Sequence, residues 1–214
     1  MPDIAVDEAG RGCLACEVVA AAVILPPDDG PLKEDVRDSK RMSAAVRTRS
    51  AAFLRTFLDD RRHLGASYGI GTASVEEIDR LNIRNATFLA MHRAVDDCMH
   101  RLSCVSGEKE EEDETSPFRI VVDGNAFRPH PNGFSHVCVV KADATRLDAS
   151  AASILAKVHR DALIDEYCDA SPKLDALYDF RSNKAYGTKK HMDALKVHGP
   201  TPLHRRTFAP VCHF

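Results

Sequence analysis

The chain has 214 residues and a mass of 23.5 kDa, with 44% hydrophobic and 29% charged residues. This length predicts a single domain, and this composition excludes disordered, collagenous and membrane-spanning chains. The longest apolar stretch, residues 18–25, is far shorter than the roughly 20 residues that cross a bilayer. The chain begins without the pattern of a secretory signal or transit peptide, and its seven cysteines are scattered. We therefore expect a reducing compartment, the cytoplasm, and no membrane.

The formal net charge of −3 is unevenly distributed. Residues 108–114 hold six acids and one lysine, so the rest of the chain carries about +2. Residues 181–214 hold seven Lys or Arg and a single acid, Asp193, and four histidines there would add charge below neutral pH. A basic terminal region suits a polyanionic partner such as a nucleic acid, although a solvated basic face would have the same composition.

The first half of the chain predicts strands and amphipathic helices in alternation. Expected strands cover residues 3–6, 17–25 and 64–71, and the first two are joined by a short turn as in an antiparallel hairpin. Ser43 is expected to cap a helix after the loop at 26–31. Ser74 and Glu77 form a capping box that opens a helical region over about 74–102.

The second half predicts two strands, 118–123 and 134–140, then an alanine-rich helix over 149–167 and one short helix near 188–198. Residues 103–117 have almost nothing apolar to bury, which predicts a disordered acidic loop within the domain. Together these elements indicate an α/β fold with a mixed sheet of about five strands flanked by helices, and a basic C-terminal extension from about residue 170.

Carboxylates lie at or just after the ends of three expected strands. Asp7 with Glu8 comes at the end of the first strand, Asp123 precedes Gly124 and Asn125, and Asp143 follows the strand at 134–140. Acids gathered at one sheet edge need a cation to stay ionised, and oxygen ligands suit Mg²⁺ or Mn²⁺. Each acid taken alone is equally typical of a turn or a cap.

Five blocks of sequence resemble ribonuclease HII, the type 2 ribonuclease H family of the bacterial type. They are IAVDEAGRGCLACEVVAAAVIL, DSKRMS, VDGN, KAD with ASAASILAKVHRD, and NKAYGTKKHMDALKVHGPTPLHRRTFAPV, in family order. The resemblance implies the ribonuclease H-like fold with a helical C-terminal extension. It also implies cleavage of RNA in RNA–DNA hybrids and of DNA strands on the 5′ side of an embedded ribonucleotide.

By this resemblance the four acids, Asp7, Glu8, Asp123 and Asp143, bind two Mg²⁺ or Mn²⁺ ions and leave 5′-phosphate and 3′-hydroxyl ends. Asp148 is expected to cap the long helix, and Asp161 to form an ion pair on its surface.

The resemblance also implies a set of substrate contacts. The GRG loop, Gly10, Arg11 and Gly12, reads the ribose 2′-hydroxyl, and Tyr186 stacks at the RNA-to-DNA junction. Ser39 and Lys40 touch the nucleic-acid backbone. Four other residues stay open between two roles: Arg205 and Arg206 either hold phosphates or brace the acids, and Ser153 and Lys157 reach either substrate or solvent.

The chain departs from the family pattern directly after the GRG loop, where the family usually has Pro-Leu-Ala-Gly-Pro. Here Cys13, Leu14, Ala15, Cys16 and Glu17 take those places. The resulting CxxC, without a second pair or a nearby histidine, is weak support for zinc or for redox chemistry. The substitutions bear on the shape of the loop and therefore on junction specificity.

Two functions other than that of a ribonuclease HII also fit part of the sequence. Another ribonuclease H-like nuclease, such as a junction resolvase or integrase core, would not need the GRG loop or Tyr186. A catalytically silent nucleic-acid-binding protein would not need the four acids. We expect a monomer without obligatory protein subunits, and no sliding-clamp docking motif after residue 211.

Overall fold

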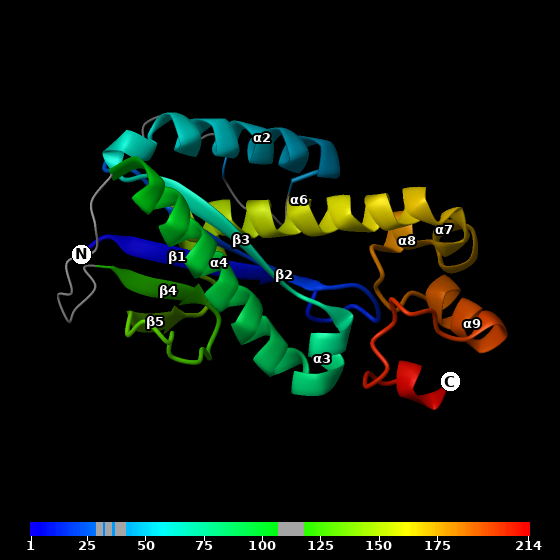
Figure 1. Ribbon diagram of the computed structural model, residues 1–214. Helices are drawn as coiled ribbons and strands as arrows, with labels where there is room; N and C mark the ends of the chain where they lie inside the picture. Colours follow the sequence, from blue (N-terminus) through cyan, green and yellow to red (C-terminus); the bar gives the residue numbers. More distant parts are fainter. Residues whose placement is uncertain (29–31, 33–35, 37–41, 107–117) are drawn as a thin grey trace.

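The computed structural model of the protein describes residues 1–28, 32, 36, 42–106 and 118–214 (Figure 1). Its centre is a five-stranded sheet in the order β3–β2–β1–β4–β5. The strands are β1 (Asp3–Ala9), β2 (Val18–Ile24), β3 (Ser67–Ala73), β4 (Arg119–Asp123) and β5 (Ser135–Val139). The pairs β1–β2 and β2–β3 are antiparallel, whereas β1–β4 and β4–β5 are parallel. The predicted mixed sheet and its first hairpin are confirmed.

Helices cover both faces of this sheet. They are α2 (Ala44–Asp60), α3 (Val75–Leu81), α4 (Ile83–Ser106), α5 (Ala142–Thr145), α6 (Leu147–Ala170), α7 (Pro172–Tyr178), α8 (Phe180–Asn183) and α9 (Lys189–His198), with 3-10 turns at Arg62–Leu64 and Val211–His213. In Figure 1, α4 crosses one face, α2 and α6 lie on the other, and α7 to α9 form the end of the molecule near the C-terminus. None of the described helices is long and apolar enough to span a membrane.

The alternation of side chains along β1 assigns its residues to the two faces of the sheet. Ile4 and Val6 pack in the core beneath α4, whereas Ala5 and Ala9 belong to clusters on the α6 side. The helix α4 comes so close to β3 that a Cβ added at Gly71 would lie 2.1 Å from the carbonyl oxygen of Ala90. Continuing the alternation sends consecutive acids at the end of β1 to opposite faces.

Two helical predictions need correction. Ser74 and Glu77 do form the capping box, but the helix breaks at Asn82, which has a φ of 67°, so α3 and α4 are separate helices. The helix α4 then continues to Ser106, four residues into the segment expected to be disordered. The remainder of that segment, including the acidic run 108–114, lies outside the described residues.

The C-terminal region holds three helices where one was predicted. Asp179 and Lys184, both with left-handed backbone, separate α7, α8 and the turn before α9. Non-glycine residues rarely adopt this conformation, so the sequence contained no sign of these breaks. The three helices pack with the end of α6 against the segment after β1, in a third core that includes Leu14, Leu174 and Leu195.

Candidate active site

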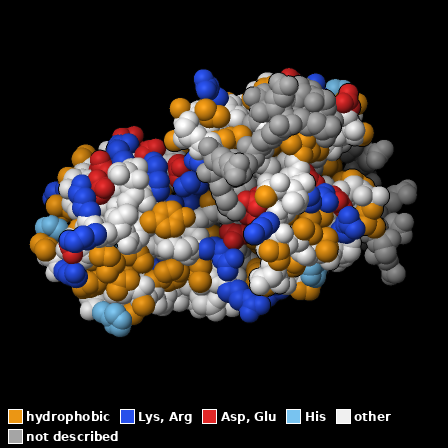
Figure 2. Space-filling model, turned by 180° about the vertical axis from the view of Figure 1, so that it is seen from behind, with side chains coloured by type: hydrophobic (Ala, Val, Ile, Leu, Met, Phe, Trp, Pro, Cys, Tyr) orange, Lys and Arg blue, Asp and Glu red, His pale blue; other side chains and the backbone are white. Residues whose placement is uncertain are grey.

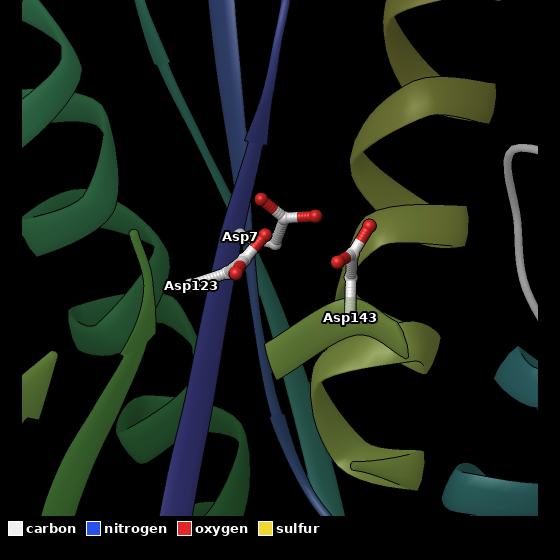
Figure 3. A group of neighbouring side chains, drawn as sticks. All are labelled: Asp7, Asp123 and Asp143. Atoms are coloured by element: carbon white, nitrogen blue, oxygen red, sulfur yellow. The ribbon is translucent and has the colours of Figure 1, made fainter. Parts of the chain in front are cut away.

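Three carboxylates converge at the C-terminal ends of the parallel strands β1 and β4. Val6 pairs with Val122, so Asp7 and Asp123 follow side by side in neighbouring strands. One oxygen each from Asp7, Asp123 and Asp143 lies within 4.8 Å of the others, and Figure 3 shows the three side chains directed at a common point. Asp7, Asp123 and Asp143, three of the four acids predicted to share one site, thus lie together, and their role as metal ligands stays a prediction.

Asp143 reaches the cluster differently from the way the sequence suggested. It lies not at a strand end but in the first turn of α5, after Lys141 turns the chain with a φ of 60°. The Ala142 N–H donates a 2.8 Å hydrogen bond to Asp123 Oδ1. This bond ties the start of α5 to the end of β4 and places Asp143 beside Asp123.

The cluster is electrostatically unfavourable without a counter-charge. Burial, with the adjacent charges of Glu8 and Asp123, raises the pKa of Asp7 to about 8, although a hydrogen bond from Ser153 acts in the opposite direction. Burial also raises the pKa of Glu8, against the effect of Arg11. Carboxylates held together in this way are compensated by a bound cation, and an all-oxygen donor set fits Mg²⁺ or Mn²⁺.

Glu8 points to the opposite face of the sheet from Asp7 and is not one of the three clustered acids. It lines a pocket of about 320 Å³ between the strand ends and α4, with Arg11, Arg84, Asp123 and Asn125 among the other lining residues. Arg11 Nη1 lies 3.1 Å from Glu8 Oε1, and the buried Glu8 Oε2 has no hydrogen-bond partner within the part of the chain that the structure describes. An acceptor oxygen thus remains for a cation next to a pocket that carries two arginines.

Two buried arginines, Arg205 and Arg160, hydrogen-bond the backbone of the GRG loop and of the residues that follow it. Arg205 donates to the carbonyl oxygens of Gly10, Arg11 and Cys16 at 2.8, 3.0 and 2.9 Å. Arg160 donates to Ala15, Glu17 and Lys184 carbonyl oxygens, and a Cβ added at Gly10, where φ is 94°, would lie 2.1 Å from Arg160 Nε. Arg205 therefore braces the GRG loop, which is neither of its two expected roles.

Two of the arginines near this loop differ in exposure: Arg206 is exposed and Arg160 is buried. The exposed Arg206 uses its guanidinium on the Pro200 carbonyl oxygen and its backbone N–H on Asp79. Arg160 was missed by the sequence reasoning, because an arginine within a long helix is ordinarily at its surface. Nothing in its spacing indicates that it is buried.

Tyr186 stands over the GRG loop with its side chain half exposed. Its ring atom Cε1 would lie 3.9 Å from a Cβ added at Gly12, so the ring covers that glycine. Burial raises the pKa of Tyr186, and the Cys13 thiol lies within hydrogen-bonding reach of its hydroxyl group. The structure thus brings together Tyr186 and the loop that the resemblance paired with it.

Both cysteines that replace family residues after the GRG loop are buried free thiols. Cys16 has a φ of 64° at the place where the family pattern has glycine. Among the described residues the only group of His, Cys, Asp or Glu side chains suited to a metal is the acid cluster, so the CxxC gains no support as a zinc site.

The remaining acids and polar residues take the following positions. Asp148 lies in the first turn of α6 and pairs with Arg146 at 2.6 Å. The residue at the N-cap position of α6 is Arg146, not Asp148 as predicted. Asp161 forms its predicted ion pair, with Lys157 at 2.8 Å, and the pair is partly buried. Ser153 instead hydrogen-bonds Asp7. Ser39 and Lys40 lie outside the described residues.

The basic C-terminal region is less cationic than its sequence suggested. Lys184, Lys189 and Lys190 have carboxylate partners at 2.8, 2.5 and 2.7 Å, namely Asp165, Asp193 and Asp179. Burial lowers the pKa of His191 and brings that of His204 to about 4, so neither adds charge near neutral pH. Figure 2 shows Lys and Arg side chains on this lobe and around a hollow that contains acidic side chains.

Solved structures share this fold. The ribonuclease H2 from Pyrococcus horikoshii OT3 matches with a TM-score of 0.63 and 21% identity, over 100% of this chain and 96% of that one. A Bst-RNase HIII in complex with Mn²⁺ matches with a TM-score of 0.61 and 15% identity, over 92% and 70%. The open mixed sheet with flanking helices is the ribonuclease H-like α/β fold.

The sequence comparisons narrow this class to one family. The family model Ribonuclease HII matches residues 4–211. The ribonuclease HII of Paramagnetospirillum magneticum is 42% identical, over 100% of this chain and 98% of its own length. The chain belongs to the ribonuclease HII family and is a ribonuclease H, a metal-binding hydrolase that cleaves RNA in RNA–DNA hybrids.

Proposed function

We propose that the chain cuts both the RNA strand of hybrids and duplex DNA on the 5′ side of embedded ribonucleotides, with two Mg²⁺ or Mn²⁺ ions held by Asp7, Glu8, Asp123 and Asp143. The observation that carries this proposal is the convergence of three carboxylate oxygens within 4.8 Å, one of them from Asp7, which precedes the GRG loop by only two intervening residues. A nucleic acid bound across the GRG loop would therefore present its phosphates to the acids.

Each acid has a separate task in this proposal. Asp123 and Asp7 hold the centre of the site from rigid strands, and Asp143 closes it from α5. Glu8 binds from the α4 side, where its buried Oε2 is available. When bound, divalent cations supply the charge that activates a water for in-line attack and stabilises the departing 3′ oxygen. The products then carry 5′-phosphate and 3′-hydroxyl ends.

Sugar identity is read in this proposal by the GRG loop together with Tyr186. The 2′-hydroxyl is the group that separates RNA from DNA, and the glycines allow the backbone to approach it closely. Tyr186 rests over Gly12, so its ring would contact the sugar adjacent to the one that the loop reads. A ribonucleotide followed by a deoxyribonucleotide satisfies both elements.

We further propose that the chain acts as a monomer. All of the acids and junction-reading residues come from one chain, and buried arginines of the same chain hold the GRG loop and the residues after it. Its substrates arise where DNA is replicated and repaired, which in a bacterial cell is the cytoplasm.

Cleavage of two duplexes tests the substrate proposal: one with a single ribonucleotide in DNA and one an all-RNA hybrid. We expect the single-ribonucleotide duplex to be cut on the 5′ side of the ribonucleotide, with ends that a DNA polymerase extends directly from the 3′-hydroxyl. Tyr186→Ala should lower the rate about a hundredfold, because a misplacement of about 1 Å has that effect, while affinity changes little. Tyr186→Phe keeps the ring and is the matched control.

Three results would each contradict a different part of this proposal. Degradation of the hybrid with no cut at the single ribonucleotide would refute junction reading and leave the ribonuclease assignment intact. Products that require removal of a 3′-phosphate before extension would refute the proposed chemistry. Co-purification with an obligatory second subunit would refute the monomer.

A further inference from the structure

We infer that His191 and His204 form a neutral, buried pair that positions Tyr186 for cleavage at the RNA-to-DNA junction. Both histidine side chains are completely buried, at the centre of the third core. This inference rests on the proposed role of Tyr186, and it concerns a residue pair far along the chain from the acids. Neither histidine touches the GRG loop surface where substrate would bind.

The hydrogen bonds of the pair run in a single direction. The Thr201 backbone N–H donates to His204 Nδ1 at 2.9 Å, and the Thr201 hydroxyl, which accepts from the Leu203 N–H, lies 2.8 Å from the same nitrogen and can donate to it; the proton of neutral His204 is therefore on Nε2. That Nε2–H donates to His191 Nε2 at 3.0 Å, which places the His191 proton on Nδ1. The Nδ1–H of His191 then donates to the Tyr186 carbonyl oxygen at 2.9 Å. One choice of tautomers satisfies all four ring nitrogens.

The surroundings of the pair favour its neutral form. The rings of Tyr178 and Phe180 pack against both histidines, and the Tyr178 hydroxyl donates to the Gly199 carbonyl oxygen rather than to a histidine. Burial lowers the pKa of both histidines, and the positive charge of Arg206 acts in the same direction on His204. A proton added to His204 Nδ1 would oppose the Thr201 N–H, and a proton added to His191 Nε2 would oppose His204.

The segment that carries Tyr186 depends on contacts of this kind. Lys184 and Ala185 both have left-handed backbone, with φ values of 48° and 63°, which costs energy for residues with side chains. Three successive carbonyl oxygens are held by different elements: that of Lys184 by Arg160, that of Ala185 by the Leu14 N–H, and that of Tyr186 by His191. Of these three hydrogen bonds, the one from His191 is made to the tyrosine residue itself.

The first two hydrogen bonds join the segment to α6 and to Leu14, two residues after the GRG loop, and the histidine bond holds the tyrosine itself. The Tyr186 carbonyl oxygen also accepts a hydrogen bond from the Thr188 N–H at 2.8 Å. Without His191 this carbonyl would keep one of its two hydrogen bonds and would be less tightly oriented. Loss of the histidine bond should therefore shift the ring relative to Gly12 rather than unfold the segment. The expected consequence is slower cleavage with almost unchanged binding.

Three substitutions at position 191 separate positioning from packing. An Asn amide places its N–H near the position of the lost Nδ1–H, whereas a Gln amide reaches toward the position of Nε2. We expect His191→Asn to keep most of the junction cleavage, and His191→Gln and His191→Leu to lower kcat on the single-ribonucleotide duplex about ten- to a hundredfold with little change in KM. His198→Asn, at an exposed histidine of the same helix, is the control and should match the unaltered enzyme.

A spectroscopic measurement tests the pair independently of activity. Nitrogen-15 chemical shifts at pH 6 should show both rings neutral, His191 protonated on Nδ1 and His204 on Nε2. The inference is overturned if either ring is charged at pH 6, if the tautomers are reversed, or if Asn and Gln at position 191 have equal effects. Should His191→Leu fail to fold, the comparison of Asn with Gln decides.

The same assays distinguish failure of this inference from failure of the proposed function. If Tyr186→Ala leaves the junction cut unchanged, the role proposed for the tyrosine is wrong. If Tyr186→Ala is slow but His191→Gln is normal, only the positioning role of the histidine pair is wrong.

Discussion

Replacing Asp7 with Asn should stabilise the metal-free protein. Asp7 is buried beside two other carboxylates, and its pKa of about 8 lies far above the ordinary value of 3.8. Asn is almost the same size and keeps both local contacts, since its oxygen can accept the Glu8 N–H that now bonds Asp7 Oδ1 at 2.7 Å, and its amide can bond Ser153. The substitution thus removes the charge and little else.

The magnitude follows from the two pKa values. At pH 7 the carboxyl group is ionised in the unfolded chain but largely protonated in the folded one, so the folded state bears a cost of up to about 4 kcal/mol. The sign is that of a raised pKa, for which stability is lost as the pH rises from about 4 toward 8. The gain from Asp7→Asn should therefore shrink below about 2 kcal/mol at pH 5.

Urea unfolding in the presence of a chelator measures this gain. Asp148→Asn is the matched control, because Asp148 is similarly buried but pairs with Arg146, and its loss should destabilise the protein. Mg²⁺ or Mn²⁺ should narrow the difference between Asp7→Asn and the unaltered protein, since a cation at a hundred times its Kd adds about 2.7 kcal/mol to the unaltered protein. A destabilised Asp7→Asn protein in chelator, or an equal gain at pH 5 and pH 7, would refute the reasoning.

Three further changes have expected outcomes that unfolding measurements can check. Gly10→Ala should cost about 2–4 kcal/mol, because the added Cβ meets Arg160 and the residue has a left-handed φ; a loss below about 1 kcal/mol would show that the loop can move aside. Arg205→Met should cost about 3–5 kcal/mol because the carbonyl oxygens of Gly10, Arg11 and Cys16 lose this donor, and a neutral effect would contradict its bracing role. As the pH falls from 6.5 to 4, the free energy of unfolding of the unaltered protein should drop by about 1.4 kcal/mol per pH unit relative to that of His204→Asn. The reason is that the lowered pKa of His204 lets the unfolded chain take up the proton first; parallel pH profiles of the two proteins would contradict this.

The sequence predicted the sheet well because its signals were local. Residues of β2 are apolar throughout and buried on both faces, and Ser74 with Glu77 forms the cap that its spacing indicates. Asp7 and Asp123 were placed together because both end strands, and parallel neighbouring strands end at one edge. Asp143 was also predicted from its place after the strand at 134–140, but its position in α5 was not, since that depends on the left-handed turn at Lys141.

The features that the sequence did not predict arise from tertiary contacts. Arg160 and Arg205 are buried by segments more than a hundred residues away, and periodicity carries no information about such partners. His191 and His204 lie in a segment whose composition is that of a basic surface, yet they are buried in an aromatic core that favours their neutral form. The helix breaks at Asn82 and Asp179 are left-handed without glycine, which no turn motif indicates.

The most direct test of the account is metal-dependent cleavage by Asp123→Asn. Asp123 lies at the centre of the acid cluster, and Asn keeps the oxygen that accepts the Ala142 N–H but removes the charge. With an RNA–DNA hybrid and saturating Mg²⁺ or Mn²⁺, we predict a rate lower by several orders of magnitude and nearly unchanged hybrid affinity. Turnover close to that of the unaltered enzyme would contradict the assignment of this cluster as the metal site.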